Sequence, residues 1–144
     1  MNKCIQTEII INAPKEKVWN ILTGFDQYAE WNPFIISSQG KLAKGERLTN
    51  TLLNGDKRIV FKPKVISVVR YQYFDWLGSL FIKGLFDGHH YFEIEELAPG
   101  QVKLTHGEHF SGVLSSYLLK RIGEDTRNNF IKMNRAVKQR AEAI

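Results

Sequence analysis

The sequence predicts a single α+β domain over residues 1–144, with the element order β-α-α-β6-α. Two features indicate this class. Apolar residues alternate in steps of two over residues 3–11 and again through much of residues 34–110, as in half-buried strands. From Leu114 onward they recur every three or four positions, which is the period of a helix. A chain of 144 residues is also the length of one ordinary domain.

The N-terminal part of the chain is predicted to form one strand and two short helices. A helix is expected over residues 14–22, because Pro14 suits a first helical turn. A second fits residues 25–31, since Pro33 forces the residue before it to be extended. One side of the preceding strand would carry Ile5, Thr7, Ile9 and Ile11.

Turn signals divide residues 34–110 into six further strands, which makes seven in all. Asn54-Gly55 is the clearest hairpin signal, because both residues tolerate positive φ. Pro63 interrupts one strand and places it at an edge or a bulge. The breaks are Gly40–Gly45, Asn54–Asp56, the region near Arg70, Gly78–Gly88 and Ala98–Gly100.

Five segments resemble the START-like, polyketide cyclase-dehydratase-like superfamily (SRPBCC, Bet v 1-like). They are Ile11–Trp19, Phe25–Phe34, Asp87–Glu95, Leu104–His106 and Phe110–Gly112. The resemblance implies a helix-grip fold, in which a curved seven-stranded antiparallel sheet wraps around a long C-terminal helix. It also implies a ligand cavity between sheet and helix. The superfamily includes carriers, cyclases, hydrolases and chaperone-associated modules, so the fold alone selects no function.

Composition narrows the partners and the compartment. No apolar run reaches the ~18 to 20 residues of a membrane span, and the N-terminus lacks a secretory pattern, so a cytoplasmic protein is expected. Cys4 is the sole cysteine, which excludes an internal disulfide and fits a reducing compartment. The net charge of +5 is interpreted as favouring solubility rather than binding, and no nucleic acid partner is expected. Basic residues are concentrated late in the chain, so transient contact with an acidic membrane surface remains an open interpretation.

Two histidines and a carboxylate are expected to meet on the apolar face of the sheet. If Ala98–Gly100 closes the hairpin so that Ile94 lies opposite Leu104, Phe92 faces His106 and His90 faces Glu108. Four interpretations stay open: a polar patch in a ligand pocket, a structural hydrogen-bonded cluster, an acid-base site, or a two-histidine-one-carboxylate metal site. We expect no metal and no other cofactor.

Aromatic residues are denser than a small helix-sheet core needs, so pocket lining is expected from several of them. The connection Gly78–Gly88 carries large apolar residues between glycines, which suggests a lid, ordinary packing, or a membrane or partner surface. The predicted ligand contacts are Trp31, Phe34, Phe61, Phe74, Trp76, Phe81, Phe86, His90, Phe92, His106, Glu108, Phe110, Leu118, Ile122 and Phe130.

The leading expectation is a protein that binds a small hydrophobic or amphipathic molecule between the sheet and the C-terminal helix. The alternative is an enzyme of cyclase, dehydratase or hydrolase type that uses His90, His106 and Glu108 in the same cavity. A protein-interaction module is a second alternative. The sequence does not decide the ligand, the presence of catalysis or the oligomeric state.

Overall fold

The computed structural model describes residues 3–80 and 82–144. The element order confirms the predicted α+β class and the long terminal helix. In chain order the elements are β1 (Cys4–Ile11), α1 (Lys15–Thr23), η1 (Phe25–Gln27), α2 (Tyr28–Trp31), β2 (Ile35–Gln39), β3 (Thr49–Asn54), β4 (Lys57–Phe61), β5 (Lys64–Val69), β6 (Tyr73–Leu80), β7 (Phe86–Ala98), β8 (Gln101–Ser111) and α3 (Ser115–Glu142).

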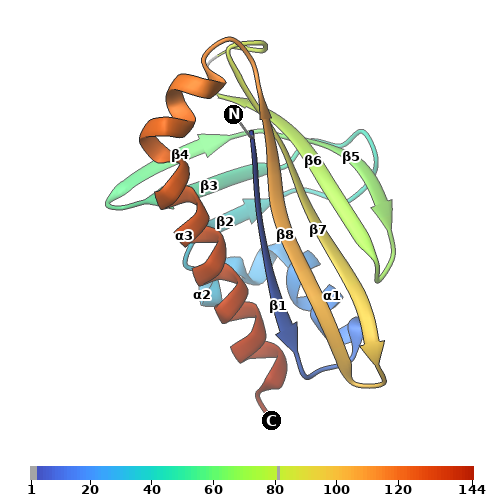
Figure 1. Ribbon diagram of the computed structural model, residues 1–144. Helices are drawn as coiled ribbons and strands as arrows, with labels where there is room; N and C mark the ends of the chain where they lie inside the picture. The colour runs from blue at the N-terminus through green and yellow to red at the C-terminus, as the bar shows by residue number, and fades with distance from the viewer. Residues whose placement is uncertain (1–2, 81) are drawn as a thin grey trace.

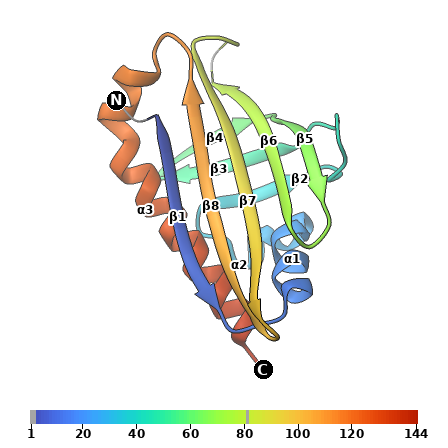
Figure 2. The ribbon, with the colours of Figure 1, turned by 45° about the vertical axis from the view of Figure 1, so that its right-hand side comes forward.

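The described residues contain eight strands, one more than predicted. The expected strand through Pro63 is divided into β4 and β5, because proline has no N–H for the ladder and the chain changes sheets there. In this part of the chain the strands form two sheets, β1-β8-β7-β6-β5 and β2-β3-β4. The smaller sheet crosses behind the larger one in both views (Figures 1 and 2).

Backbone hydrogen bonds join the two sheets beside Pro63. The amide of Leu48 donates to the carbonyl of Pro63 at 2.9 Å, and the amide of Val65 donates to the carbonyl of Glu46 at 2.8 Å. The segment before β3 therefore continues along β5. The predicted single curved sheet is realised as two sheets that are hydrogen-bonded at this corner.

Gly78 and Gly88 lie inside strands rather than in a connection, which corrects the expectation for this segment. They pair with each other in the ladder between β6 and β7. Neither has a positive φ, so the turn signal read from them was wrong. A Cβ at Gly78 would come within 3.2 Å of Phe61 and Pro63, so close approach explains this glycine. Phe81 lies outside the described residues.

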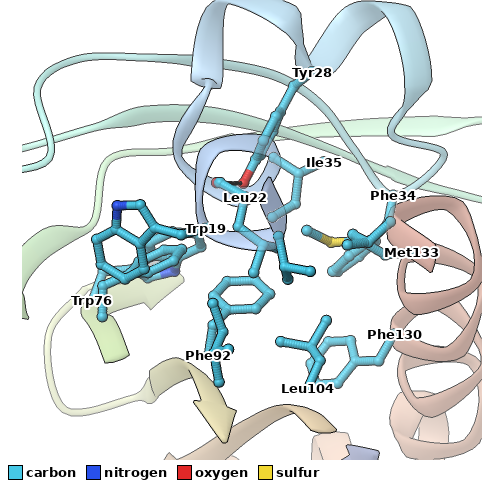
Figure 3. Close-up of a cluster of buried hydrophobic side chains, with 14 of the residues drawn as sticks. Trp19, Leu22, Tyr28, Phe34, Ile35, Trp76, Phe92, Leu104, Phe130 and Met133 are labelled. Atoms are coloured by element: carbon cyan, nitrogen blue, oxygen red, sulfur yellow. Dashed lines mark hydrogen bonds between the residues drawn. The ribbon is translucent and has the colours of Figure 1, made fainter. Parts of the chain in front are cut away.

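The C-terminal half of α3 fills the concave face of the larger sheet. Phe130 and Met133 are fully buried, and Figure 3 shows them facing Phe34 and Leu104. The ring of Phe130 stacks on the ring of His106, with centroids 4.2 Å apart. Leu118 and Ile122, in the N-terminal half, are only half-buried. Space is left beneath the part of the helix that carries Ile122 and Thr126.

Helix α3 also covers the free edge of β1, which is the outermost strand on that side of the larger sheet. Arg127 Nη1 donates to the carbonyl of Gln6 at 3.1 Å, and Lys138 Nζ donates to the carbonyl of Ile10 at 2.8 Å. These two basic side chains satisfy edge carbonyls that would otherwise depend on water. No helix in the described part of the chain is long and apolar enough to cross a membrane.

Replacing Phe130 with alanine is expected to lower the free energy of unfolding by about 3 to 5 kcal/mol, because a fully buried ring would leave a cavity. Denaturant unfolding measures this change. The exposed Lys132 on the same helix provides the control, since Lys132→Ala should alter stability by less than about 0.5 kcal/mol. Equal losses in both variants would contradict the packing described for α3.

Candidate functional site

A cavity of about 130 Å³ lies between the N-terminal half of α3, the β3–β4 hairpin and the adjoining ends of β6, β7 and β8. A polar groove adjoins the cavity between residues 54–57 of the hairpin and residues 125–135 of α3. Asn54 and Asn129 line both the cavity and this groove. The cavity meets the groove at these two amides. Its apolar walls are formed by Phe34, Leu52, Ile59, Phe61, Leu80, Phe86, Phe110 and Ile122.

Small residues on the strands and stacked rings beside them keep this space open. Gly78 and Gly88 line the cavity from neighbouring strands. A Cβ at Gly88 would collide with the carboxyl group of Glu108, so only glycine leaves that group room against the strand. Phe86 and Phe110 stack nearly parallel, with centroids 5.3 Å apart, and form one wall.

One polar side chain, Glu108, links the cavity to a buried hydrogen-bonded chain. Its Oε1 lies 3.3 Å from Nδ1 of His90, and Nε2 of His90 lies 2.7 Å from Nε2 of His106. Nδ1 of His106 lies 2.9 Å from Oδ1 of Asn134 on α3. The amide of Asn134 donates to Oγ1 of Thr7 on β1 at 2.8 Å. The predicted meeting of the two histidines and the carboxylate is therefore observed, and His90 pairs with Glu108 in the ladder as predicted.

Burial determines the charge of the hydrogen-bonded side chains of Glu108, His90 and His106. It raises the pKa of Glu108 to about 8, although the charge of His89 opposes the shift. Burial, and then the charge of His89, lower the pKa of His90 to about 3. Burial likewise holds the pKa of His106 well below its usual range. The Glu108 side chain is 19% exposed, so the acid touches the cavity while both imidazoles lie behind it. Near neutral pH all three groups are largely uncharged.

The structure brings together some of the predicted ligand contacts and places others in the packed core. Phe74, Trp76, Phe92 and Phe130 are fully or almost fully buried and do not line the cavity. Trp31 packs edge-on against Tyr28 at 5.2 Å, and Leu118 is half-buried on α3. His90 and His106 lie behind Glu108. The predicted contacts that line the cavity are Phe34, Phe61, Phe86, Glu108, Phe110 and Ile122.

Several residues of the site were not identified from the sequence. Leu52 and Ile59 face each other across the predicted Asn54-Gly55 hairpin, so the hairpin register was the available signal. Asn134 is a polar residue within the apolar stripe of α3, which is typical of a buried hydrogen-bonding group. Its partner Thr7 gives a similar signal, because it is a polar residue between Ile5 and Ile9 on one side of β1.

The histidines direct nitrogens at each other, so they and Glu108 do not surround a common point. Among residues 3–80 and 82–144, no group of three or more His, Cys, Asp or Glu side chains is placed to hold a metal ion.

Replacing Glu108 with glutamine is expected to stabilise the fold relative to wild type, by an amount that grows as the pH rises from 4.5 to about 8. These limits are the ordinary pKa of the side chain and its raised pKa in the folded protein. The stability that the protonated acid contributes is complete below pH 4.5 and is lost as the pH rises through the folded-state pKa. A glutamine amide donates to His90 without titrating. The variant should therefore gain on the order of 2 to 4 kcal/mol relative to wild type across this range.

Urea unfolding at the two ends of the interval measures the gain. The titration of His90 is common to both proteins and cancels in the difference. An equal difference at both pH values would contradict the raised pKa.

Solved structures share this fold over nearly the whole chain. The hypothetical protein jhp0584 from Helicobacter pylori matches with a TM-score of 0.82 at 15% identity, covering 99% of this chain and 89% of that one. A START superfamily protein from Mycobacterium smegmatis matches with a TM-score of 0.74 at 18% identity, covering 96% and 97%. The Zhui aromatase/cyclase from Streptomyces sp. R1128 matches with a TM-score of 0.76 at 13% identity, covering 96% and 93%.

Likenesses at these identities establish the helix-grip fold and no more. No curated protein matches the sequence. Residues 3–142 match the family described as polyketide cyclase / dehydrase and lipid transport. Because this match spans almost the entire chain, the protein belongs to the polyketide cyclase/dehydrase and lipid transport family, within the SRPBCC-like superfamily.

Proposed function

We propose that this protein binds a small hydrophobic or amphipathic molecule in the cavity beneath the N-terminal half of α3. The observation that carries the proposal is that side chains fill one end of the space between the larger sheet and α3 but not the other end. Phe130 and Met133 fill the concave face at one end, whereas Gly78 and Gly88 leave space at the other. The family description, which includes lipid transport, supports the same function.

The size and lining of the cavity favour a single ring or a short stretch of alkyl chain. A dry apolar cavity of about 150 Å³ is known to hold benzene, and this one measures about 130 Å³. Burying about 200 Å² of apolar ligand surface gains on the order of 5 kcal/mol before ordering costs. A longer ligand would extend past Asn54 and Asn129 into the polar groove, which suits an amphipathic molecule.

The end of the molecule next to the cavity wall exposes apolar side chains. Ile82 is 67% exposed and Val113 is 79% exposed. The two loops that carry them are joined, because the amide of Val113 donates to the carbonyl of Gly84 at 3.0 Å. Figures 1 and 2 show these loops together at the top of the molecule. This tip supports a lid or a transient membrane-surface contact, in a protein that we propose to be cytoplasmic.

Filling the cavity with Ile122→Trp is expected to abolish binding of toluene, a neutral one-ring probe. Ligand-observed NMR and thermal unfolding both report binding, since a ligand that binds only the folded state raises Tm. Glu124→Trp, on the exposed face of the same helix, is the matched control and should bind toluene as wild type does. If wild type and both variants respond alike, binding does not occur in this cavity and the proposal fails.

A second candidate function is acid-base catalysis of the cyclase, dehydratase or hydrolase type. The observation that favours it is the contact of a cavity-lining acid, Glu108, with His90. Under the binding proposal, Glu108→Gln should change ligand affinity by less than about tenfold, and wild type should show no turnover in a panel of polyketide-like and ester substrates.

Catalysis would give a different result. Wild-type turnover that falls about 10²-fold or more in Glu108→Gln, at unchanged affinity, would establish the second function in place of the first.

A further inference from the structure

The direction of each hydrogen bond in the buried chain follows from one backbone carbonyl. The carbonyl of His106 can only accept, so the hydroxyl of Thr7 donates to it, at 2.9 Å. Oγ1 of Thr7 then accepts from the Nδ2 amide of Asn134, at 2.8 Å. This orients the amide so that Oδ1 of Asn134 accepts from Nδ1–H of His106, at 2.9 Å.

The same reasoning continues through both imidazoles. A neutral His106 with its proton on Nδ1 has only a lone pair at Nε2, so it accepts from Nε2–H of His90 at 2.7 Å. A neutral His90 then has only a lone pair at Nδ1. Only a protonated Glu108 can complete the 3.3 Å bond between Oε1 and that nitrogen. Both histidines are buried, which favours these neutral forms.

The second oxygen of Glu108 remains for a ligand. Oε2 lies over Gly88, in the space that a Cβ at that position would occupy, and both residues line the cavity. None of the described side chains or backbone groups forms a hydrogen bond or ion pair with Oε2. When the acid proton is on Oε1, Oε2 is a carbonyl-type acceptor.

We propose that Oε2 of Glu108 accepts a hydrogen bond from the hydroxyl group of an apolar alcohol or phenol held in the cavity. This inference rests on the ligand binding proposed above and adds the chemical class of the ligand. A carboxylate end group would bring negative charge to an acceptor, and an ammonium group would be a buried charge without a charged partner. Asn134 and Thr7 are positioning residues, because they act on the acid through the two histidines.

Nitrogen-15 NMR of the histidine rings tests the direction of the chain in the unliganded protein. At pH 7, His106 is expected to carry its proton on Nδ1 only and His90 on Nε2 only. Glu108→Gln should preserve both tautomers, because its amide donates to His90 in place of the acid. An imidazolium at either histidine, or the opposite tautomers, would mean that Glu108 is not a neutral donor and would overturn the inference.

Probe selectivity tests the ligand class. The ratio of p-cresol affinity to toluene affinity should fall by about tenfold in Glu108→Met, which keeps the side-chain volume but removes the acceptor. It should stay unchanged in Glu108→Gln, whose free oxygen is also an acceptor. The anion p-toluate should bind wild type more weakly than p-cresol at pH 7.

The outcomes separate this inference from the function on which it rests. If toluene binds and the ratio is the same in wild type and Glu108→Met, the hydroxyl contact is wrong while cavity binding stands. Binding of p-toluate as tight as that of p-cresol would also overturn it. If neither neutral probe binds, the proposed function fails and this inference fails with it.

Discussion

A buried amide on α3 determines how the terminal helix sits on the larger sheet. Asn134 connects His106 on β8 with Thr7 on β1. Sliding or rotating the helix would leave these buried groups unpaired, at about 1 to 3 kcal/mol for each. Apolar contacts alone would tolerate such a shift more easily. Because Ile122 lies about three turns earlier on the same helix, the position of the cavity wall depends on this pairing.

The interior is divided by the size of the side chains along the strands. Where β6 and β7 carry Phe74, Trp76 and Phe92, the rings contact each other and the space is filled. Further along the same two strands, Gly78 and Gly88 pair and the space opens. The change occurs over a few residues on one face. The ladder itself therefore places the packed core beside the site, and the acid lies at the boundary between them.

The sequence predicts the fold class, the order of the helices and the pairing of His90 with Glu108, because each depends on local signals. The turn after Ala98 and the bulge between Glu96 and Ala98 together set the register of β7 and β8, and the register determines which side chains meet. No local signal in the sequence determines where the cavity lies. It depends on the tilt of α3 across the sheet, so the face that periodicity assigns to Phe74 and Phe130 does not reveal whether that part of the face is covered.

The two-sheet arrangement and the pairing of the glycines also depend on distant contacts. Pro63 signals an interruption, but the join through Leu48 forms between segments that no sequence pattern relates. In the sequence Gly88 looks like a turn residue. In the structure a glycine is found there because a Cβ would collide with the carboxyl group of Glu108 on the next strand. The contact between Asn134 and Thr7 spans almost the whole chain.

The way α3 covers β1 limits how the molecule can open without aggregating. Its bonds to that edge strand begin at Arg127 and continue through Lys138, and Glu142 accepts from the amide of Asn12 at 2.8 Å. Detaching the whole helix would expose a strand edge together with an apolar interior, which is the combination that templates strand addition between molecules. Residues 115–126 make no such bond to β1 within the described structure. If a molecule entered the cavity by displacing only these turns, the rest of α3 would still cover the edge of β1.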